Sequence, residues 1–307
     1  MSREASPVSA GSSGTATTNR LAATAATEQE RQRRRRIASI LRNRNLMLGA
    51  GILLVLVVVG LLAPHLSPYD PINPDYATTL LSPSLSHPFG TDNFGRDIFT
   101  RVLYGIRIDL RVGVISVIPP FIIGLLLGSL AAYFGGVADT IVMRMVDVVQ
   151  AFPFLVLVIA IVAILGPGLN NMYIAVAVTA WIVYARLIRG EILVEKQKEY
   201  VVAAQAMGGT NRRIIWHHLL PNTIVSSVVY SMADIALYIL LAAGLSFLGL
   251  GAKPPSPEWG EMITEGQTFI TTAWWMSALP GLAIIITGIA LSLLGDGLSD
   301  VLRPGTR

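Results

Sequence analysis

The sequence contains no cysteine and few charged residues. The missing cysteines exclude disulfide scaffolds, catalytic thiols and cysteine-ligated metal sites. Only 14% of the 307 residues are charged, whereas 53% are hydrophobic. A soluble domain of this length would need more charged residues to cover its surface. The composition is therefore that of a polytopic membrane protein.

Several catalytic patterns are also missing. No GxxxxGK[ST] segment occurs, so ATP and its magnesium are expected on other subunits. The sequence contains no HExxH motif and no Ser/His arrangement of the kind that an intramembrane enzyme would need. The adjacent His217 and His218 do not share a helix face, which makes them a poor chelate. We predict a non-catalytic protein that has no metal site or cofactor of its own.

The N-terminal region, residues 1–45, is predicted to be a disordered basic tail. Residues 1–30 are rich in Ser, Thr, Ala and Gly. The segment "RQRRRR" at 31–36 could indicate nucleic-acid binding. It approaches an apolar run, however, and juxtamembrane arginines favour a cytoplasmic topology anchor at the lipid surface. That apolar run begins near residue 46, too deep for a signal peptide, so 46–64 is expected to remain as the first membrane helix.

Apolar runs predict an all-α protein with six transmembrane helices. Each run is long enough to cross a bilayer as a helix and too long for a strand. Proline pairs or single prolines interrupt three of them, as kinks for packing or as hinges. The runs cover 46–63, 112–134, 148–169, 170–189, 222–250 and 275–297, and the prolines are Pro119, Pro120, Pro153 and Pro280.

The distribution of Lys and Arg predicts the orientation. Counted with flanking residues, 18 of the 23 basic residues fall in the tail 1–45, in 135–147, in 190–221 and after the last run. Basic residues accumulate on the cytoplasmic side of membrane helices. Both termini and the loop 190–221 are therefore expected in the cytoplasm. The loop 65–111 and the segment 252–274 are expected outside.

The cytoplasmic loop contains "EYVVAAQAMGGTNRRIIWHHLLPN" at 199–222, which we call the elbow. Its pattern predicts a helix over 195–207, a glycine turn and a second short helix capped by Thr210. Pro221 is expected to end that helix. One face of the first helix would carry small side chains against which another protein can pack closely, with basic residues beside it for electrostatic docking. The residues of that face are Tyr200, Ala203, Ala204 and Met207. The turn consists of Gly208 and Gly209, and the basic residues are Arg212 and Arg213.

The elbow resembles the coupling motif of ABC importer permeases, which is Glu-Ala-Ala, three residues, Gly and a later Leu-Pro. Ala203, Ala204, Gly208, Leu220 and Pro221 match this motif. Val202 replaces its Glu, and His218 stands where Ile is usual. The resemblance implies that the elbow contacts ATPase subunits through Ala203, Ala204, Met207, Gly208, Gly209, Arg212, Arg213, Leu220 and Pro221.

Three further segments are similar to the peptide/nickel class of these permeases, in particular to its second (C-type) subunit. They are "HPFGTDNFGRDIFTRVLYGIRIDL" (87–110), "LSFLGLGAKPPSPEWGEMI" (245–263) and "LPGLAIIITGIALSLLGDGLSDVLRP" (279–304). Asp109 and Ala242 depart from the class, which tends to have Ser and an acid there. The resemblance, which covers about 40–305, implies a type I importer fold with its permease core over 112–303.

The resemblance also implies a function and partners. The chain would be one permease of a heterodimer in a prokaryotic cell membrane, with two ATPase subunits and an external solute-binding protein, and would work by alternating access. Di- or oligopeptides are the expected substrates, and nickel chelates, haem or another small solute are alternatives. A secondary transporter is the alternative of a different class, but it would need coupling acids or broken half-helices near the midplane.

Other candidate residues lie outside the elbow. In "GTDNFGRD", Asp92 or Asn93 is expected to cap a helix running through Arg101. This segment either orders an outer lid or forms a docking or gating surface, with Asp92, Arg96 and Asp97 as candidates. Trp259 is expected to be exposed, for docking or as an interfacial anchor. Asp234 is an intramembrane acid, which either lines the pathway or bonds to a Ser or Tyr of the partner subunit.

Overall fold

The computed structural model of the chain describes residues 41–302, so the predicted disorder of 1–30 and the arginine run at 31–36 lie outside the described residues. The described part is helical and contains no β-sheet, which confirms the all-α class. The α-helices are α2 (Arg44–Leu66), α3 (Ile98–Phe134), α4 (Gly136–Gln150), α5 (Phe154–Leu165), α6 (Leu169–Glu195), α7 (Glu199–Ala206), α8 (Asn211–Arg213), α9 (Leu220–Phe247), α10 (Trp259–Gly266) and α11 (Trp275–Leu302). Three shorter turns are η1 (Tyr76–Thr78), the π-helical η2 (Ile214–Leu219) and η3 (Gln267–Phe269).

Five helices within the described residues are long and apolar enough to cross a membrane, namely α2, α3, α6, α11 and α9 with the turns that precede it. The pair α4–α5 makes a sixth span if it is counted as one, but it is bent by 83°. The prediction of a single helix over 148–169 is therefore wrong. Pro153 is the N-cap of α5 and separates it from α4, because proline disfavours helical geometry in the preceding residue. Pro119, Pro120 and Pro280, by contrast, lie inside continuous helices.

Helix α3 begins at Ile98, well before the predicted start at 112. Its 37 residues extend over about 56 Å at 1.5 Å per residue, against a hydrocarbon core of about 30 Å. Asp97 caps it by accepting from the Thr100 N–H at 2.7 Å. The predicted cap at Asp92 or Asn93 is wrong, because Asp92 instead accepts from Phe94 and Arg96 N–H groups inside a turn. The outer loop is correspondingly shorter than predicted.

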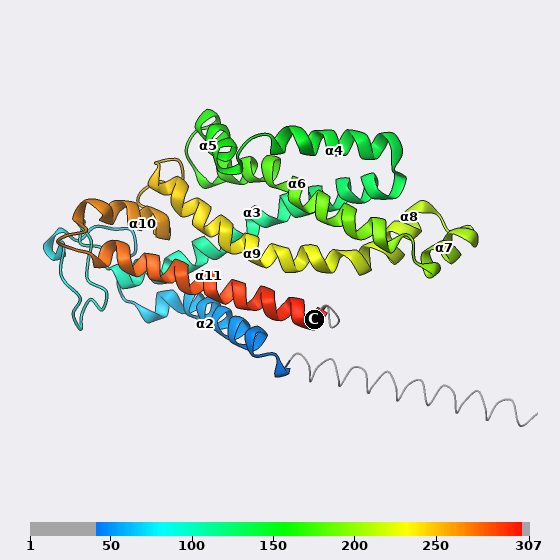
Figure 1. The fold of residues 1–307 in the computed structure, drawn as a ribbon. Coiled ribbons are helices and arrows are strands. Elements are labelled where there is room, and N and C mark those ends of the chain that lie inside the picture. Colours follow the sequence, from blue (N-terminus) through cyan, green and yellow to red (C-terminus); the bar gives the residue numbers. More distant parts are fainter. Residues whose placement is uncertain (1–40, 303–307) are drawn as a thin grey trace, which may run out of the picture.

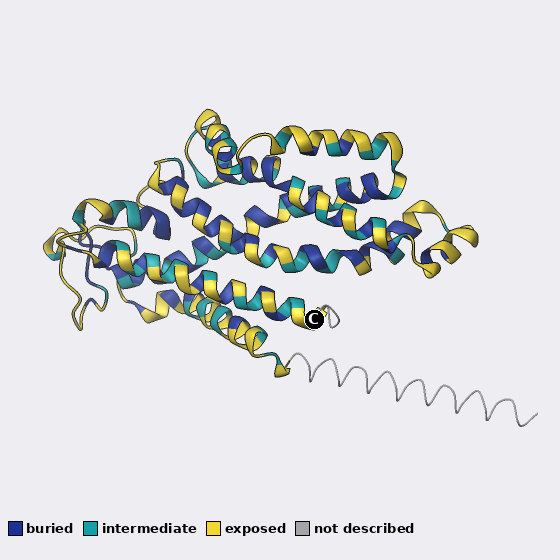
Figure 2. Ribbon diagram, viewed as in Figure 1, coloured by how far each residue is buried: buried dark blue, intermediate teal, exposed yellow. Residues whose placement is uncertain are grey.

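The helices form an elongated bundle in which α3 packs on both α6 and α9, while α11 packs on α2 and α9 (Figure 1). Small residues allow the α3–α6 contact. A Cβ added at Gly124 would lie 2.4 Å from Tyr184 Cβ, and one at Gly128 would lie 2.5 Å from the Ala185 carbonyl oxygen. Backbones that approach this closely exclude larger side chains, as is common between membrane helices. Buried residues accordingly line the helix–helix contacts (Figure 2).

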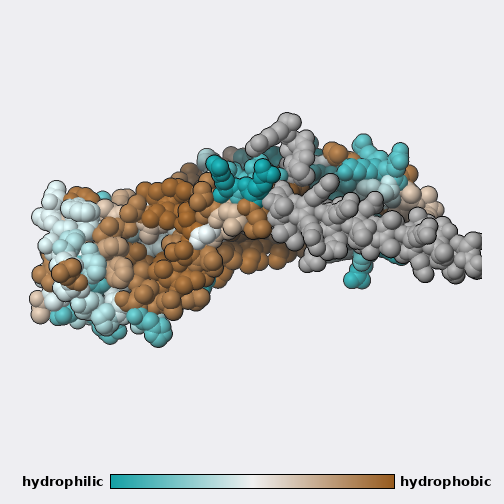
Figure 3. Space-filling model, turned by 90° about the horizontal axis from the view of Figure 1, so that it is seen from below, coloured by the Kyte–Doolittle hydropathy of each residue, from teal (hydrophilic) through white to brown (hydrophobic). Residues whose placement is uncertain are grey.

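The surface changes character along the long axis. On the face shown in Figure 3, hydrophobic residues form a broad band beside one hydrophilic end, and a second hydrophilic group follows this band. Outward-facing Leu54, Val55 and Leu61 of α2 are each at least 60% exposed, as expected for side chains that contact lipid. The elbow helices α7 and α8 lie at one end, and α10 with the 67–97 segment lies at the other (Figure 1). The two candidate regions are thus separated by an apolar belt.

Candidate functional site

The turn of the elbow depends on both glycines, each for its own reason. The Gly208 N–H donates to the Gln205 carbonyl and the Gly209 N–H to the Ala204 carbonyl, both at 3.0 Å. This pair of bonds is the Schellman motif, which needs a left-handed residue after the helix. Gly208 supplies it with φ +77°. At Gly209 an added Cβ would lie 2.7 Å from the Ala204 carbonyl oxygen, so a side chain does not fit there.

The second half of the elbow is helical up to the membrane. The Thr210 hydroxyl accepts from the Arg213 N–H, which confirms the predicted cap of α8. The chain then continues through the π-helical turn η2 directly into α9. Pro221 does not end this helix as predicted, because it lies in the first turn of α9, where its missing N–H is tolerated. Sequence reasoning missed η2 altogether.

A buried apolar cluster fixes the elbow to the membrane helices. It joins the ends of α3 and α6 to α7, η2 and the start of α9, and it consists of Ala132, Ile188, Ile192, Val201, Ile214, Ile215, Leu219 and Leu220. Polar contacts add to it. Tyr200 donates to Glu195 at 2.6 Å and accepts from Asn222 at 3.0 Å, while Tyr133 donates to Asn211 at 2.8 Å. The elbow is therefore held firmly by α3, α6 and α9.

The exposed side of the elbow differs from the predicted face. Ala203 and Met207 point outwards, and Met207 is 82% exposed. Ala204 is 8% exposed and packs inside this chain, so its predicted place on an outer contact face is wrong. Two flanking regions extend the free surface. Arg212 and Arg213 are exposed, and an open groove of about 630 Å3 next to α7 is lined by Tyr133, Phe134, Lys196, Gln197, Val202 and Gln205.

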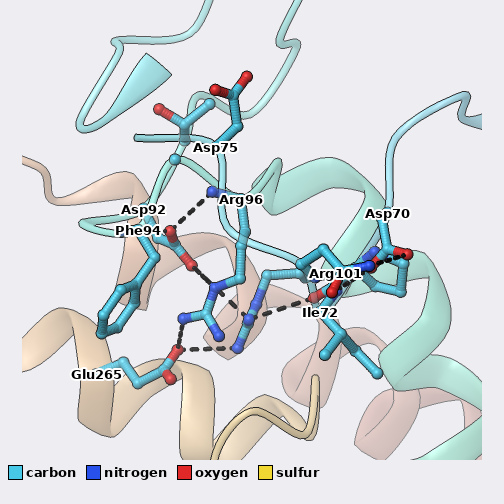
Figure 4. A network of polar contacts seen from close by, with 12 residues as sticks. Asp70, Ile72, Asp75, Asp92, Phe94, Arg96, Arg101 and Glu265 are labelled. Carbon is cyan, nitrogen blue, oxygen red and sulfur yellow. Dashed lines mark hydrogen bonds and ion pairs between the residues drawn. The ribbon is translucent and has the colours of Figure 1, made fainter. Parts of the chain in front are cut away.

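At the opposite end, two arginines and two acids form a buried network that we call the outer charge cluster (Figure 4). Arg96 pairs with Asp92 at 2.6 Å and with Glu265 at 2.8 Å. Arg101 pairs with the same Glu265 oxygen at 2.8 Å and lies 3.7 Å from Asp92. Both arginines and Asp92 are at most 3% exposed. The cluster ties the loop before α3 to α10, and sequence reasoning missed Arg101 and Glu265.

Asp97 is buried beside this cluster. It contacts His87 at 2.9 Å and caps α3. Because Asp92, Arg96 and Asp97 use their side chains inside the chain, their geometry favours the ordering of an outer lid over direct docking. A docking or gating role for these three residues stays a prediction.

Trp259 is fully buried, so its predicted exposure is wrong. Its indole N–H donates to the Val102 carbonyl at 3.1 Å, and its backbone N–H donates to Asp109 at 3.2 Å. Gly105 leaves room for the ring, since a Cβ there would lie 2.4 Å from the indole nitrogen. Trp259 thus anchors α10 on α3 and cannot dock an external protein in this conformation.

Three glutamates lie in α10 or at its N-cap, namely Glu258, Glu261 and Glu265. Glu258 caps the helix through the N–H groups of Gly260 and Glu261, at 2.9 and 2.8 Å. Glu261 is buried, and this burial raises the pKa of its carboxyl group to about 7, with a further rise from the neighbouring Glu265 and Glu258. The arginines of the outer charge cluster oppose that rise. Glu261 therefore titrates close to neutral pH.

Asp234 lies inside the bundle with two tyrosines. Tyr184 of α6 and Tyr238 of α9 both donate to its Oδ2 atom, at 2.6 and 3.2 Å. Two of its hydrogen-bond partners are therefore within this chain. A contact with the partner subunit stays a prediction. Asp234 also lines a cavity of about 280 Å3 beside the α4–α5 bend. No group of three or more His, Asp or Glu residues within 41–302 is arranged to hold a metal ion.

The comparison with protein families matches residues 124–307 to the model described as "Binding-protein-dependent transport system inner membrane component". Residues 33–83 match the N-terminal transmembrane domain of oligopeptide transport permease C. The chain belongs to the binding-protein-dependent ABC transport permeases. The resemblance seen in the sequence is thereby confirmed.

Curated relatives of this permease cover most of its length. The dipeptide transport system permease protein DppC of Alkalihalophilus pseudofirmus is 42% identical over 86% of both chains. The glutathione transport system permease protein GsiD of Pectobacterium atrosepticum is 44% identical over 85% of this chain and 88% of that protein. DppC of Bacillus subtilis is 40% identical over 87% of this chain and 83% of that protein.

A solved structure of the inward-facing MetNI methionine ABC transporter supports the fold. One of its chains matches with a TM-score of 0.52 and 21% identity, over 67% of this permease and 97% of that chain. The type I importer permease fold is confirmed. The protein is a multi-pass membrane subunit of an ABC importer, not an enzyme, and it works in a complex with ATPase and binding-protein partners.

Proposed function

We propose that this permease imports di- or oligopeptides across a prokaryotic cell membrane. The observation that carries the proposal is the extent of the match: relatives described as dipeptide and glutathione permeases each align over about 85% of the chain or more. Glutathione is itself a tripeptide, so both names describe small peptides. The match to an oligopeptide permease domain at 33–83 agrees with this assignment.

The substrate can be tested in liposomes that contain the whole transporter with its binding protein. We expect ATP-dependent uptake of labelled di- or tripeptides and little uptake of a nickel chelate or haem. Preferred uptake of the chelate or haem would replace peptides by one of those alternatives. Uptake driven by an ion gradient without ATP would contradict an ABC importer and favour a secondary transporter.

The proposed complex contains a second, homologous permease, two ATPase subunits and an external binding protein. In it, both termini and the elbow face the cytoplasm. The excess of basic residues in the inner segments supports this orientation, as does the position of the elbow and α10 at opposite ends of the molecule. Accessibility tags at residue 210 and at the exposed residue 254 should report cytoplasm and exterior respectively. An external residue 210 would overturn the orientation.

The proposed role of the elbow is to receive the movement of the ATPases. Ala203, Met207, Arg212 and Arg213 would contact the ATPase directly, since they are exposed. Ala204, Gly208, Gly209, Leu220 and Pro221 would act by shaping the elbow, through the turn and the apolar cluster beneath it. Since that cluster includes residues of α3 and α6, a push on the elbow would reach both helices. Alternating access would follow from their movement.

A further inference from the structure

The cavity beside the α4–α5 bend is a site within the membrane-spanning part of the permease. It measures about 280 Å3, far more than the roughly 10–15 Å3 that one water molecule needs. It lies at the 83° bend between α4 and α5, and residues of α6 and α9 line its other sides. Phe152, Phe154, Tyr230 and Leu237 make much of its lining apolar or aromatic.

One carboxylate lies in this lining without an opposite charge. Asp234 is the single acidic residue among the cavity-lining residues, and no Lys, Arg or His is found there. Within the described chain no ion pair to Asp234 is formed. Both tyrosine hydroxyls donate to Oδ2, and no donor among the described residues reaches Oδ1. One oxygen is thus held in place, while the other is left for a ligand.

These features select a positively charged ligand. A carboxylate inside the membrane is costly unless a partner compensates it. Aromatic rings attract cations as well, and Tyr230 lies next to Tyr184 with their ring centroids 5.7 Å apart. A ligand with a small ammonium group and an apolar remainder would meet the carboxylate, the rings and the apolar wall together. An anionic chelate would be repelled by Asp234.

We propose that this cavity is a transport subsite for a primary ammonium group, with Asp234 as its counter-ion. The inference rests on the proposed peptide import, because the free amino terminus of a peptide is such a group. It identifies the part of the peptide that this permease recognises during translocation. Tyr184 and Tyr238 position the carboxylate.

The absence of cysteine from the sequence allows a direct test. In the full complex, Leu237→Cys places one thiol at the cavity, on a residue that is 47% exposed. Leu240→Cys serves as the matched control, since it lies on the same helix, is 60% exposed and does not line the cavity. The rate at which a maleimide labels this subunit is then measured with alanyl-alanine, N-acetyl-alanyl-alanine, propylammonium chloride or sodium chloride.

Alanyl-alanine and propylammonium are expected to slow labelling at residue 237 by about tenfold, as a charge-assisted contact implies, and to leave residue 240 unchanged. The acetylated peptide and sodium should have no effect. Asp234→Asn should remove the protection, and Asp234→Glu should retain it. Equal protection by the acetylated peptide or by sodium would overturn the inference, as would undiminished protection in Asp234→Asn.

Two comparisons keep the test independent of folding and of the proposed function. The acetylated and free peptides are compared with Asp234 intact, so a misfolded Asp234→Asn variant leaves the result standing. Protection by propylammonium but not by alanyl-alanine would support the ammonium subsite while counting against a peptide substrate. Peptide uptake in liposomes without protection by either amine would support the proposed function and overturn the subsite.

Discussion

The two ends of the permease are built in opposite ways. At the outer charge cluster, charged side chains are buried and pair with one another, so little of their binding capacity is left for a partner. At the elbow, the buried part is apolar, while Met207, Arg212 and Arg213 remain free at the surface. The outer end therefore fixes its own conformation. The elbow combines a base packed on α3, α6 and α9 with an exposed surface.

The largest effect is expected from Arg101→Ala at the outer end. The change leaves Glu265 and Asp92 with fewer buried counter-charges, and breaking a buried pair in this way costs about 3–5 kcal/mol of the free energy of unfolding. Thermal unfolding of the purified complex measures it. The control is Arg144→Ala, whose side chain is 79% exposed and whose removal should cost within about 0.5 kcal/mol. Equal unfolding temperatures for both variants would show that the cluster does not stabilise the outer end.

Gly208→Val is expected to cost less stability than Arg101→Ala but to uncouple ATP hydrolysis from transport. The left-handed conformation costs a β-branched residue about 1–2 kcal/mol, whereas nothing in this chain lies within 4 Å of the new Cβ. Expression should survive, while the ATPases co-purify poorly or hydrolyse ATP without transport. Gly190→Val is the control, because it also meets open space but has no positive φ. If Gly208→Val supports wild-type uptake and wild-type coupling to ATP hydrolysis, the elbow does not transmit the movement of the ATPases.

The exposure of neighbouring alanines sharpens the same comparison. Ala203→Asp adds a charge to the exposed side of α7, so we expect weaker ATPase binding with normal expression. Ala204→Asp places the charge against the apolar interior, so we expect low expression or a less stable subunit. Expression and ATPase co-purification are measured for both. Identical behaviour would argue that the two residues share one surface.

A pH dependence is expected from Glu261. Its carboxyl has a folded-state pKa of about 7, above the ordinary value of 4.5, so the folded protein binds this proton more tightly than the unfolded chain. The resulting stability is fully present below about pH 4.5 and is lost as the pH rises through about 7. Unfolding temperatures between pH 4.5 and 8 should fall less in Glu261→Gln than in the wild type. The control Glu199→Gln, at an exposed position, should leave the pH dependence of the unfolding temperature unchanged. The same pH dependence in Glu261→Gln as in the wild type would show that Glu261 is not its cause.

The smallest effect is expected from Val202→Glu, which restores the acid of the coupling motif. Val202 is 52% exposed and lines the open groove beside α7, so a carboxylate there stays in water. Uptake and ATPase activity should remain close to the wild-type values. A strong loss of coupling would mean that the ATPase surface opposite residue 202 is apolar in this transporter.

The features that sequence could predict depend on neighbours in the chain. Long apolar runs predicted α2, α6, α9 and α11, and local capping chemistry predicted the turn at Gly208 and the cap at Thr210. The missed features depend on distant contacts. Arg101 was expected in a helix, but its burial and its pairing were missed because its partner, Glu265, lies 164 residues away. Trp259 was predicted to be exposed because nothing near it in sequence reveals the space that Gly105 provides.

Two further differences also depend on residues that are distant in the sequence. Residues 135–147 were predicted to be an inner segment between two membrane runs, whereas most of them belong to helix α4. In the structure, Arg189 of α6 holds Asp139 through two contacts, at 2.5 and 2.6 Å. The cavity at Asp234 required the fold itself, since the acid was visible in the sequence while its tyrosine partners and the α4–α5 bend beside it were not.

The length of α3 has a mechanical consequence. This one helix carries Arg101 and the Asp109 contact to Trp259 near its beginning, and at its end Ala132 and Tyr133 hold the elbow. Its prolines, Pro119 and Pro120, lie close to the middle. A helix of this kind would act as a lever that pivots about its middle. A tilt of roughly 10° about the midpoint displaces each tip by about 5 Å in opposite directions, so inner closing and outer opening would be two ends of one rotation.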